Sequence, residues 1–259
     1  MRESKNANAS ATGDVLALLQ ALRGLEILDV SPTISADLPM WFMYEPPVVT
    51  PIVRHDQGGA AVNMLSLSEH SGSHVDAPFH FDAAGLTMAE VPVDALLLRP
   101  FCKYDLSRDG HQPGDLIAVD HLQAAEKRGG FTVKPGDVAI LEVGWDRNLP
   151  GGPEGRDPTW WGRNQPGLSD DACEYLAGLG VAAVACDTAA CDVAAADAAI
   201  SGAHGHVSAF LPRGILIIEG LTRLAGVAAT GLFLALPLKI ADGTGSPIRV
   251  VLLTERPAI

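Results

Sequence analysis

The stretch EHSGSHVDAPFHF, residues 69–81, places three of the chain's eight histidines and one aspartate within eleven residues. Its small residues and its proline are unfavourable inside a helix. In an extended chain, His70, His74, Asp76 and His80 all occupy even positions and point to one face. Imidazoles and a carboxylate without cysteine are typical ligands of Zn²⁺, Mn²⁺, Fe²⁺ or Co²⁺. The pattern therefore favours a metal site over a set of surface polar residues on an edge strand.

The rest of the chain predicts an α/β protein. Short apolar runs of strand-like composition recur between turn residues, at 26–31, 60–69, 137–144, 181–187, 215–220 and 248–255. Helical patterns are fewer, at 14–24, 118–130 and 168–180. Several strands are too apolar to be half-exposed, which indicates a mixed, mostly buried sheet. Without a convincing linker, we expect one domain over residues 1–259, with residues 1–13 as a flexible tail.

Composition excludes several classes of function. The formal net charge is −13, so nucleic acid and anionic membrane surfaces are poor electrostatic partners. The sequence has no apolar run of membrane-spanning length, and its first residues are polar without the apolar core of a secretory signal. We therefore expect a cytoplasmic protein. The four cysteines show no C-x-x-C spacing, so buried free thiols are expected instead of a zinc ribbon.

A second segment is expected to complete the metal site. Residues 201–220 contain His204, His206 and Glu219, and Glu219 ends an otherwise apolar strand. A buried, unpaired carboxylate is costly, so Glu219 needs a cation. A metal ion would satisfy this requirement.

Residues 146–167 form a long segment rich in glycine and proline that includes the adjacent Trp160 and Trp161. A loop of this length is usually a functional lid or a disordered insert, and the aromatic pair favours an ordered lid. Together with Trp41 and Phe42, these side chains are expected to stack against a flat substrate and to exclude water. The alternative for the aromatic residues is packing in the core or in an interface.

The motif HSGSHVDAPFHF resembles the H-x-G-T-H-x-D-x-P-x-H-F signature of metal-dependent cyclase-like hydrolases, a family that includes bacterial kynurenine formamidases and isatin hydrolases. Further segments are similar to blocks of that family, at 28–41, 136–145, 167–188, 214–224 and 234–252. The resemblance implies a swivelling β/β/α domain. It also implies a homodimer or homotetramer with sites near the subunit interface.

Carried over residue by residue, the resemblance implies that His70, His74 and Asp76 are metal ligands and that His80 is the acid/base histidine. Glu219 would be a distal ligand with a histidine about twelve residues upstream. Position 207 is valine in this chain and His206 is thirteen residues away, so either His206 or His204 is the distal histidine. One or two Zn²⁺ or Mn²⁺ ions would bind.

The expected reaction is hydrolysis of a small cyclic amide, aryl formamide or lactone. A divalent ion would lower the pKa of water to about 7, and His80 would relay a proton to the leaving group. The segments 41–44 and 187–192 depart from the formamidase pattern, so hydrolysis is better supported than N-formylkynurenine as the substrate. Two alternatives are a 2-His-1-carboxylate iron oxygenase and a non-catalytic metal- or ligand-binding member of the family.

Overall fold

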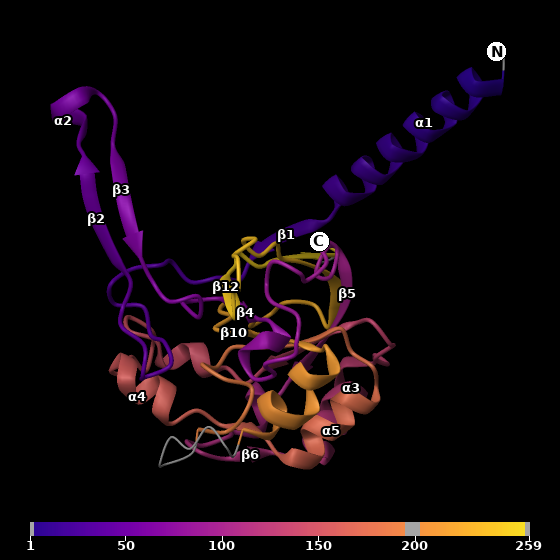
Figure 1. Cartoon of the computed structure of the whole chain (residues 1–259). Coiled ribbons are helices and arrows are strands. Elements are labelled where there is room, and N and C mark those ends of the chain that lie inside the picture. The colour runs from indigo at the N-terminus through magenta and orange to yellow at the C-terminus, as the bar shows by residue number, and fades with distance from the viewer. Residues whose placement is uncertain (1–2, 195–202, 257–259) are drawn as a thin grey trace.

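A curled mixed sheet forms the centre of the molecule (Figure 1). The structure is a computed structural model that describes residues 3–194 and 203–256. The sheet has nine strands in the order β1 (Glu26–Asp29), β13 (Val251–Thr254), β11 (Thr230–Leu234), β5 (Arg99–Asp105), β7 (Val138–Glu142), β9 (Ala183–Cys186), β10 (Leu216–Glu219), β4 (His74–Asp76) and β12 (Gly245–Pro247). The central strands β5, β7, β9 and β10 are parallel to one another, and the outer pairs are antiparallel. The predicted mixed α/β sheet is therefore confirmed.

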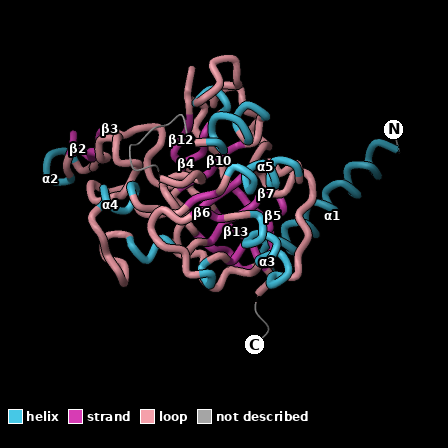
Figure 2. Tube along the Cα trace, turned by 90° about the horizontal axis from the view of Figure 1, so that it is seen from below, coloured by secondary structure: helices cyan, strands magenta, loops and turns pink. Residues whose placement is uncertain are grey.

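Helices and two small sheets surround this central sheet. The helices are α1 (Glu3–Gly24), α2 (His55–Gly58), α3 (Val119–Gly129), α4 (Pro158–Arg163) and α5 (Asp170–Gly178). The small sheets pair β2 (Val48–Val53) with β3 (Val62–Ser66), and β6 (Leu116–Ile117) with β8 (Gly167–Leu168). Figure 2 shows α3 and α5 together against the central strands. Within the described residues, none of the helices has the length and the apolar composition needed to cross a membrane.

Strand β7 illustrates how the sequence builds two cores. Its residues are all buried, and alternate side chains enter different apolar clusters. Ala139 and Leu141 pack on the side of α3 and α5, whereas Val138 and Ile140 pack on the opposite side. This period of two is the geometry of a pleated strand, and it makes both faces of the sheet apolar.

Two elements project from this body. The helix α1 and the hairpin formed by β2, α2 and β3 extend outwards on different sides (Figures 1 and 2). Of the tail expected at residues 1–13, residues 1–2 lie outside the described residues and residues 3–13 belong to α1; the flexibility of this tail stays a prediction. The helix predicted at 14–24 therefore begins earlier than its apolar pattern indicates.

The histidine-rich stretch is only partly extended. The strand β4 covers His74–Asp76, whereas His70 precedes a turn at Gly72 and His80 ends a 3-10 turn, η1 (Pro78–His80). Gly72 has φ +65°, a left-handed conformation that favours glycine. The expectation of one continuous strand from 70 to 80 is therefore wrong, because the glycine turn and the proline at position 78 interrupt it.

Candidate functional site

The strand pair β4–β10 forms the base of a buried polar cluster. Glu219 lies opposite His74 in this antiparallel pair, and Asp76 lies opposite Ile217. Since Ile217 belongs to the core on the helix side of the sheet and Val75 to the opposite core, the polar side chains share the helix side. The His74 Nε2 atom lies 3.2 Å from Glu219 Oε2 and 3.5 Å from Asp76 Oδ1.

His206 reaches the same cluster from a separate segment. It belongs to a π-helical turn, η5 (Gly205–Ala209), and its Nε2 atom lies 3.2 Å from Glu219 Oε1 and 3.4 Å from Asp76 Oδ2. His206 and Glu219 are thirteen residues apart, and the chain between them begins with this π-helical turn. His204 points away and pairs with Glu174 at 3.0 Å. The structure thus brings His206, and not His204, to the cluster.

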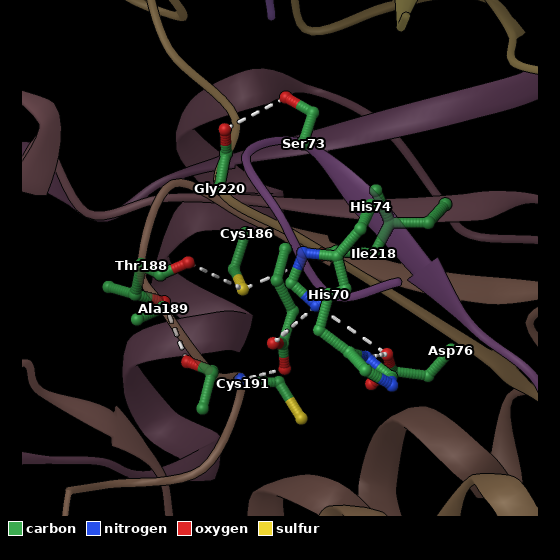
Figure 3. A network of polar contacts seen from close by, with 12 residues as sticks. His70, Ser73, His74, Asp76, Cys186, Thr188, Ala189, Cys191, Ile218 and Gly220 are labelled. Atoms are coloured by element: carbon green, nitrogen blue, oxygen red, sulfur yellow. Dashed lines mark hydrogen bonds and ion pairs between the residues drawn. The ribbon is translucent and has the colours of Figure 1, made fainter. Parts of the chain in front are cut away.

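His70 closes another side of the cluster from the loop before β4. Its Nδ1 atom lies 2.7 Å from Asp76 Oδ1, and its Nε2 atom lies 3.0 Å from the Thr244 hydroxyl. The Thr244 hydroxyl donates in turn to Glu69 at 2.6 Å. Figure 3 shows His70 and His74 beside Asp76 within this network.

His80 lies at the edge of the cluster, among aromatic rings. It stacks on His70 with 4.1 Å between ring centroids, and it meets Phe81 edge-on at 4.5 Å. Tyr44 stacks on the His70 ring at 5.7 Å, and Phe81 contacts His206 at 5.1 Å. His80 is only partly buried, so its ring is accessible from outside while the other three imidazoles are enclosed.

The electrostatics of the cluster reflect its burial. Burial alone would lower the pKa of His74, but Glu219 and Asp76 raise that pKa to about 9. For Asp76, burial opposes ionisation, yet the facing imidazoles hold its pKa well below the usual range. Burial lowers the pKa of His80 to about 4, so this imidazole is neutral at neutral pH. Burial, with Asp76 and Glu219, raises the pKa of Tyr44 to about 12, so its phenol keeps its proton.

The donor set fits a divalent cation. The potential ligand atoms of His74, Asp76 and Glu219 lie within 4.8 Å of one another, as do those of His70, Asp76 and His80. Asp76 is 1% exposed, and its Oδ2 atom is buried without a hydrogen-bond partner. An orphaned buried carboxylate oxygen is costly unless a cation satisfies it. Nitrogen and oxygen ligands of this kind suit Zn²⁺ and Mn²⁺.

The predicted substrate-binding aromatic residues pack against the core on the helix side of the sheet or against one another. Trp161 is 2% exposed and packs against Trp145, with which it exchanges two indole-to-carbonyl hydrogen bonds. Trp160 is partly buried and stacks on Trp145 at 5.6 Å, so both tryptophans make packing contacts, and their contact with a substrate stays a prediction. Trp41 and Phe42 are partly buried and contact each other at 4.7 Å. The segment 146–167 is ordered, as expected, and contains α4.

Several residues of the site were not singled out from the sequence. Asp192 receives the His206 Nδ1–H at 2.6 Å, and the Cys191 amide donates to Glu219 at 3.2 Å. Tyr44 and Thr244 contact His70 as described above. In the sequence, Asp192 is a polar residue at the end of the segment 187–192, and Tyr44 is an aromatic residue within 41–44. The spacing of these residues does not indicate that they contact His206 and His70.

Comparison with known proteins agrees with this geometry. The family model described as "Putative cyclase" matches residues 28–193. The chain belongs to this family. The matched region starts just before the end of β1 and covers β4 and Asp192, so α1 lies outside it.

Relatives of this cyclase-family protein include characterised hydrolases. A kynurenine formamidase from Delftia acidovorans is 27% identical over 191 residues, which is 74% of this chain and 79% of the relative. An isatin hydrolase bound to the product analogue thioisatinate has a TM-score of 0.80 at 24% identity, covering 96% of this chain and 99% of its own. Isatin hydrolase A from Ralstonia solanacearum has a TM-score of 0.80 at 25% identity, covering 93% of this chain and 97% of its own. These similarities confirm the predicted cyclase-like fold.

Proposed function

We propose that this protein is a metal-dependent amidohydrolase that opens a C–N bond in a small cyclic amide or an aryl formamide. The observation that carries the proposal is the convergence of buried imidazoles and carboxylates around Asp76, whose Oδ2 atom is buried without a hydrogen-bond partner. The relatives named a kynurenine formamidase and isatin hydrolases support this class of substrate. A small lactone would fit the same chemistry.

The metal would be held by five side chains, His70, His74, Asp76, His206 and Glu219. When bound, a divalent ion such as Zn²⁺ or Mn²⁺ supplies Lewis acidity, which brings the pKa of water to about 7 and stabilises negative charge on a carbonyl oxygen. Asp76 belongs to two of the three groups of close ligand atoms, one with His74 and Glu219 and one with His70 and His80, so it would be central to holding one or two ions. This set exceeds the two histidines and one carboxylate of an iron oxygenase.

His80 would be the acid/base residue. Its neutral ring can accept a proton from water and deliver it to the departing nitrogen, because its low pKa leaves it unprotonated at neutral pH. Stacking on His70 fixes the plane of the ring. The protonated phenol of Tyr44, on the other side of His70, can donate a hydrogen bond to a substrate oxygen.

We also propose that the protein is a homodimer or homotetramer in the cytoplasm. The β2–β3 hairpin exposes apolar side chains on both faces, including Val48, Ile52, Met64 and Leu65. A two-stranded hairpin is marginal in water by itself, and such surfaces usually mark an interface, here with a second copy of the chain. All four cysteines are free and buried, in agreement with a reducing compartment.

The test is hydrolysis followed by proton release with a pH indicator. Isatin, N-formylkynurenine and a small lactone panel would be offered to protein loaded with Mn²⁺ or Zn²⁺, with and without chelator. We expect chelator-sensitive turnover of an amide, and its near-complete loss in Asp76→Ala. Asp120→Ala, at an exposed carboxylate on α3, is the matched control. Wild-type turnover in Asp76→Ala would refute the assignment, and metal-loaded protein inert towards every substrate would favour the non-catalytic alternative.

A further inference from the structure

We propose that Asp192 is a positioning residue that fixes the His206 ring so that its Nε2 atom faces Asp76 and Glu219. The proposal rests on the function proposed above, in which His206 is a metal ligand. It adds a residue that would control metal binding through its bonds to His206.

Asp192 holds both the backbone and the ring of His206. Its Oδ2 atom accepts the ring Nδ1–H at 2.6 Å and the His206 amide at 3.2 Å, while its Oδ1 atom accepts the Gly205 amide at 2.7 Å. When Nδ1 donates its proton to Asp192, Nε2 is the nitrogen that the neutral ring can offer to a metal, and it is the atom directed at Asp76 and Glu219. Carboxylate partners of this kind commonly set the tautomer of a metal-binding histidine.

The surroundings keep Asp192 ionised and fixed. The side chain is 5% exposed, and the Cys173 and Cys191 thiols lie 3.9 and 3.7 Å from its oxygens. Burial raises the pKa of both thiols, so they keep their protons and can act as donors. Although burial opposes ionisation, the bonds from His206 and the two amides lower the pKa of Asp192.

Gly205 permits this close approach. A Cβ atom at position 205 would lie 2.9 Å from Asp192 Oδ2, closer than real Cβ contacts, and 3.1 Å from Cys191 Sγ, tighter than most of them. The carboxylate can therefore reach two successive amides only because residue 205 has no side chain. Replacing Gly205 by alanine should displace Asp192 while keeping both its charge and the His206 ring.

Asp187 provides a matched control. It is also a buried carboxylate that follows β9, and it accepts three backbone amides, from Val143, Gly144 and Trp145, at 2.7 to 3.0 Å. None of these bonds goes to a side chain of the polar cluster. Loss of either carboxylate should weaken the fold, but only loss of Asp192 should change how the cluster holds a metal.

The experiment compares Asp192→Asn, Asp187→Asn and His206→Ala. In Asp192→Asn, the amide nitrogen must face either the Gly205 amide or the His206 ring, so one donor loses its acceptor. The dissociation constants of Zn²⁺ and Mn²⁺ would be measured by competition with a chromogenic chelator, and thermal unfolding would be followed in chelator. We expect metal affinity to fall about 10- to 100-fold in Asp192→Asn and to stay at the wild-type value in Asp187→Asn.

Each failure has a separate signature. Wild-type metal affinity in Asp192→Asn, with affinity lost in His206→Ala, would overturn only the role of Asp192. Equal loss of affinity in Asp187→Asn would overturn it too, because the effect would then be structural. If Asp192→Asn does not fold, the metal affinity of Gly205→Ala is measured instead. An affinity equal to that of the wild-type protein would refute the role of Asp192. Wild-type protein that binds neither ion, or His206→Ala with unchanged affinity, would overturn the proposed function as well.

Discussion

Glu219→Gln should remove most of the stability that a bound metal adds to the folded protein. The wild-type carboxylate is 4% exposed, and its two oxygens each lie 3.2 Å from a histidine Nε2 atom, of His74 and of His206. Glutamine keeps the size of the side chain but removes the charge and one acceptor. A direct ligand should matter at least as much as an outer partner, so we expect metal affinity to fall by about 100-fold or more.

The size of the stability effect follows from mass action. At a free metal concentration 100 times the wild-type dissociation constant, binding stabilises the native protein by about 2.7 kcal/mol. With 100-fold weaker binding, the same concentration gives only about 0.4 kcal/mol by the same relation. The difference of about 2.3 kcal/mol corresponds to about 5 to 9 °C in melting temperature for a chain of this size.

The assay is thermal unfolding of both proteins, each with chelator and with metal. The chelator measurement gives the intrinsic effect of the substitution, and only the increase on adding metal is compared between proteins. Wild-type protein should gain several degrees and Glu219→Gln almost none. An equal gain in both proteins would show that Glu219 does not bind the ion, and would refute its assignment.

Four further predictions concern other residues. His80→Gln should reduce turnover by about 10² to 10⁴ at saturating metal while metal affinity stays unchanged; lost affinity would make His80 a ligand. The pKa of His80 falls from 6.5 to about 4 on folding, so between these pH values the unfolded chain binds one proton more than the folded chain. The free energy of unfolding should therefore decrease as the pH falls from 6.5 to about 4. This decrease should be less steep in His80→Gln. Trp161→Ala should lower the free energy of unfolding by about 3 to 5 kcal/mol, measured by urea unfolding; a raised KM at wild-type stability would instead indicate substrate contact. Leu65→Glu, in the hairpin, should shift the protein towards monomer in sedimentation, whereas Val93→Glu, at an exposed position outside the hairpin, should not.

The sequence was most informative where local pattern and burial coincide. The apolar runs of β7, β9 and β10 predicted buried strands, and Ser169 caps α5 as its side chain allows. The signature histidines were found because they are close in sequence. These histidines do lie together in the structure. They come from the strand β4, the loop before it and a 3-10 turn, and not from one face of a single extended strand.

The remaining parts of the site depend on contacts between distant segments. The resemblance left His204 and His206 open, because neither is twelve residues before Glu219. The structure separates them, since His206 meets Glu219 and His204 pairs with Glu174. Asp192 and Thr244 resemble ordinary loop residues until the fold brings them to His206 and His70. Trp161 looked like a lid residue because adjacent tryptophans do not reveal which of them faces the core.

The position of the cluster in the sheet explains why it needs several segments. β10 is parallel to β9 on one side and antiparallel to β4 on the other, so the sheet changes direction at this strand. The loop after β9 therefore reaches the end of β10 at Glu219, where the Cys191 amide meets it. Asp192 follows directly and holds the turn that brings in His206. Glu219, a carboxylate at the end of an apolar strand, thus meets imidazoles from both sides, His74 of β4 and His206 of the segment that follows β9, so a cation buried there would be held by ligands from more than one segment.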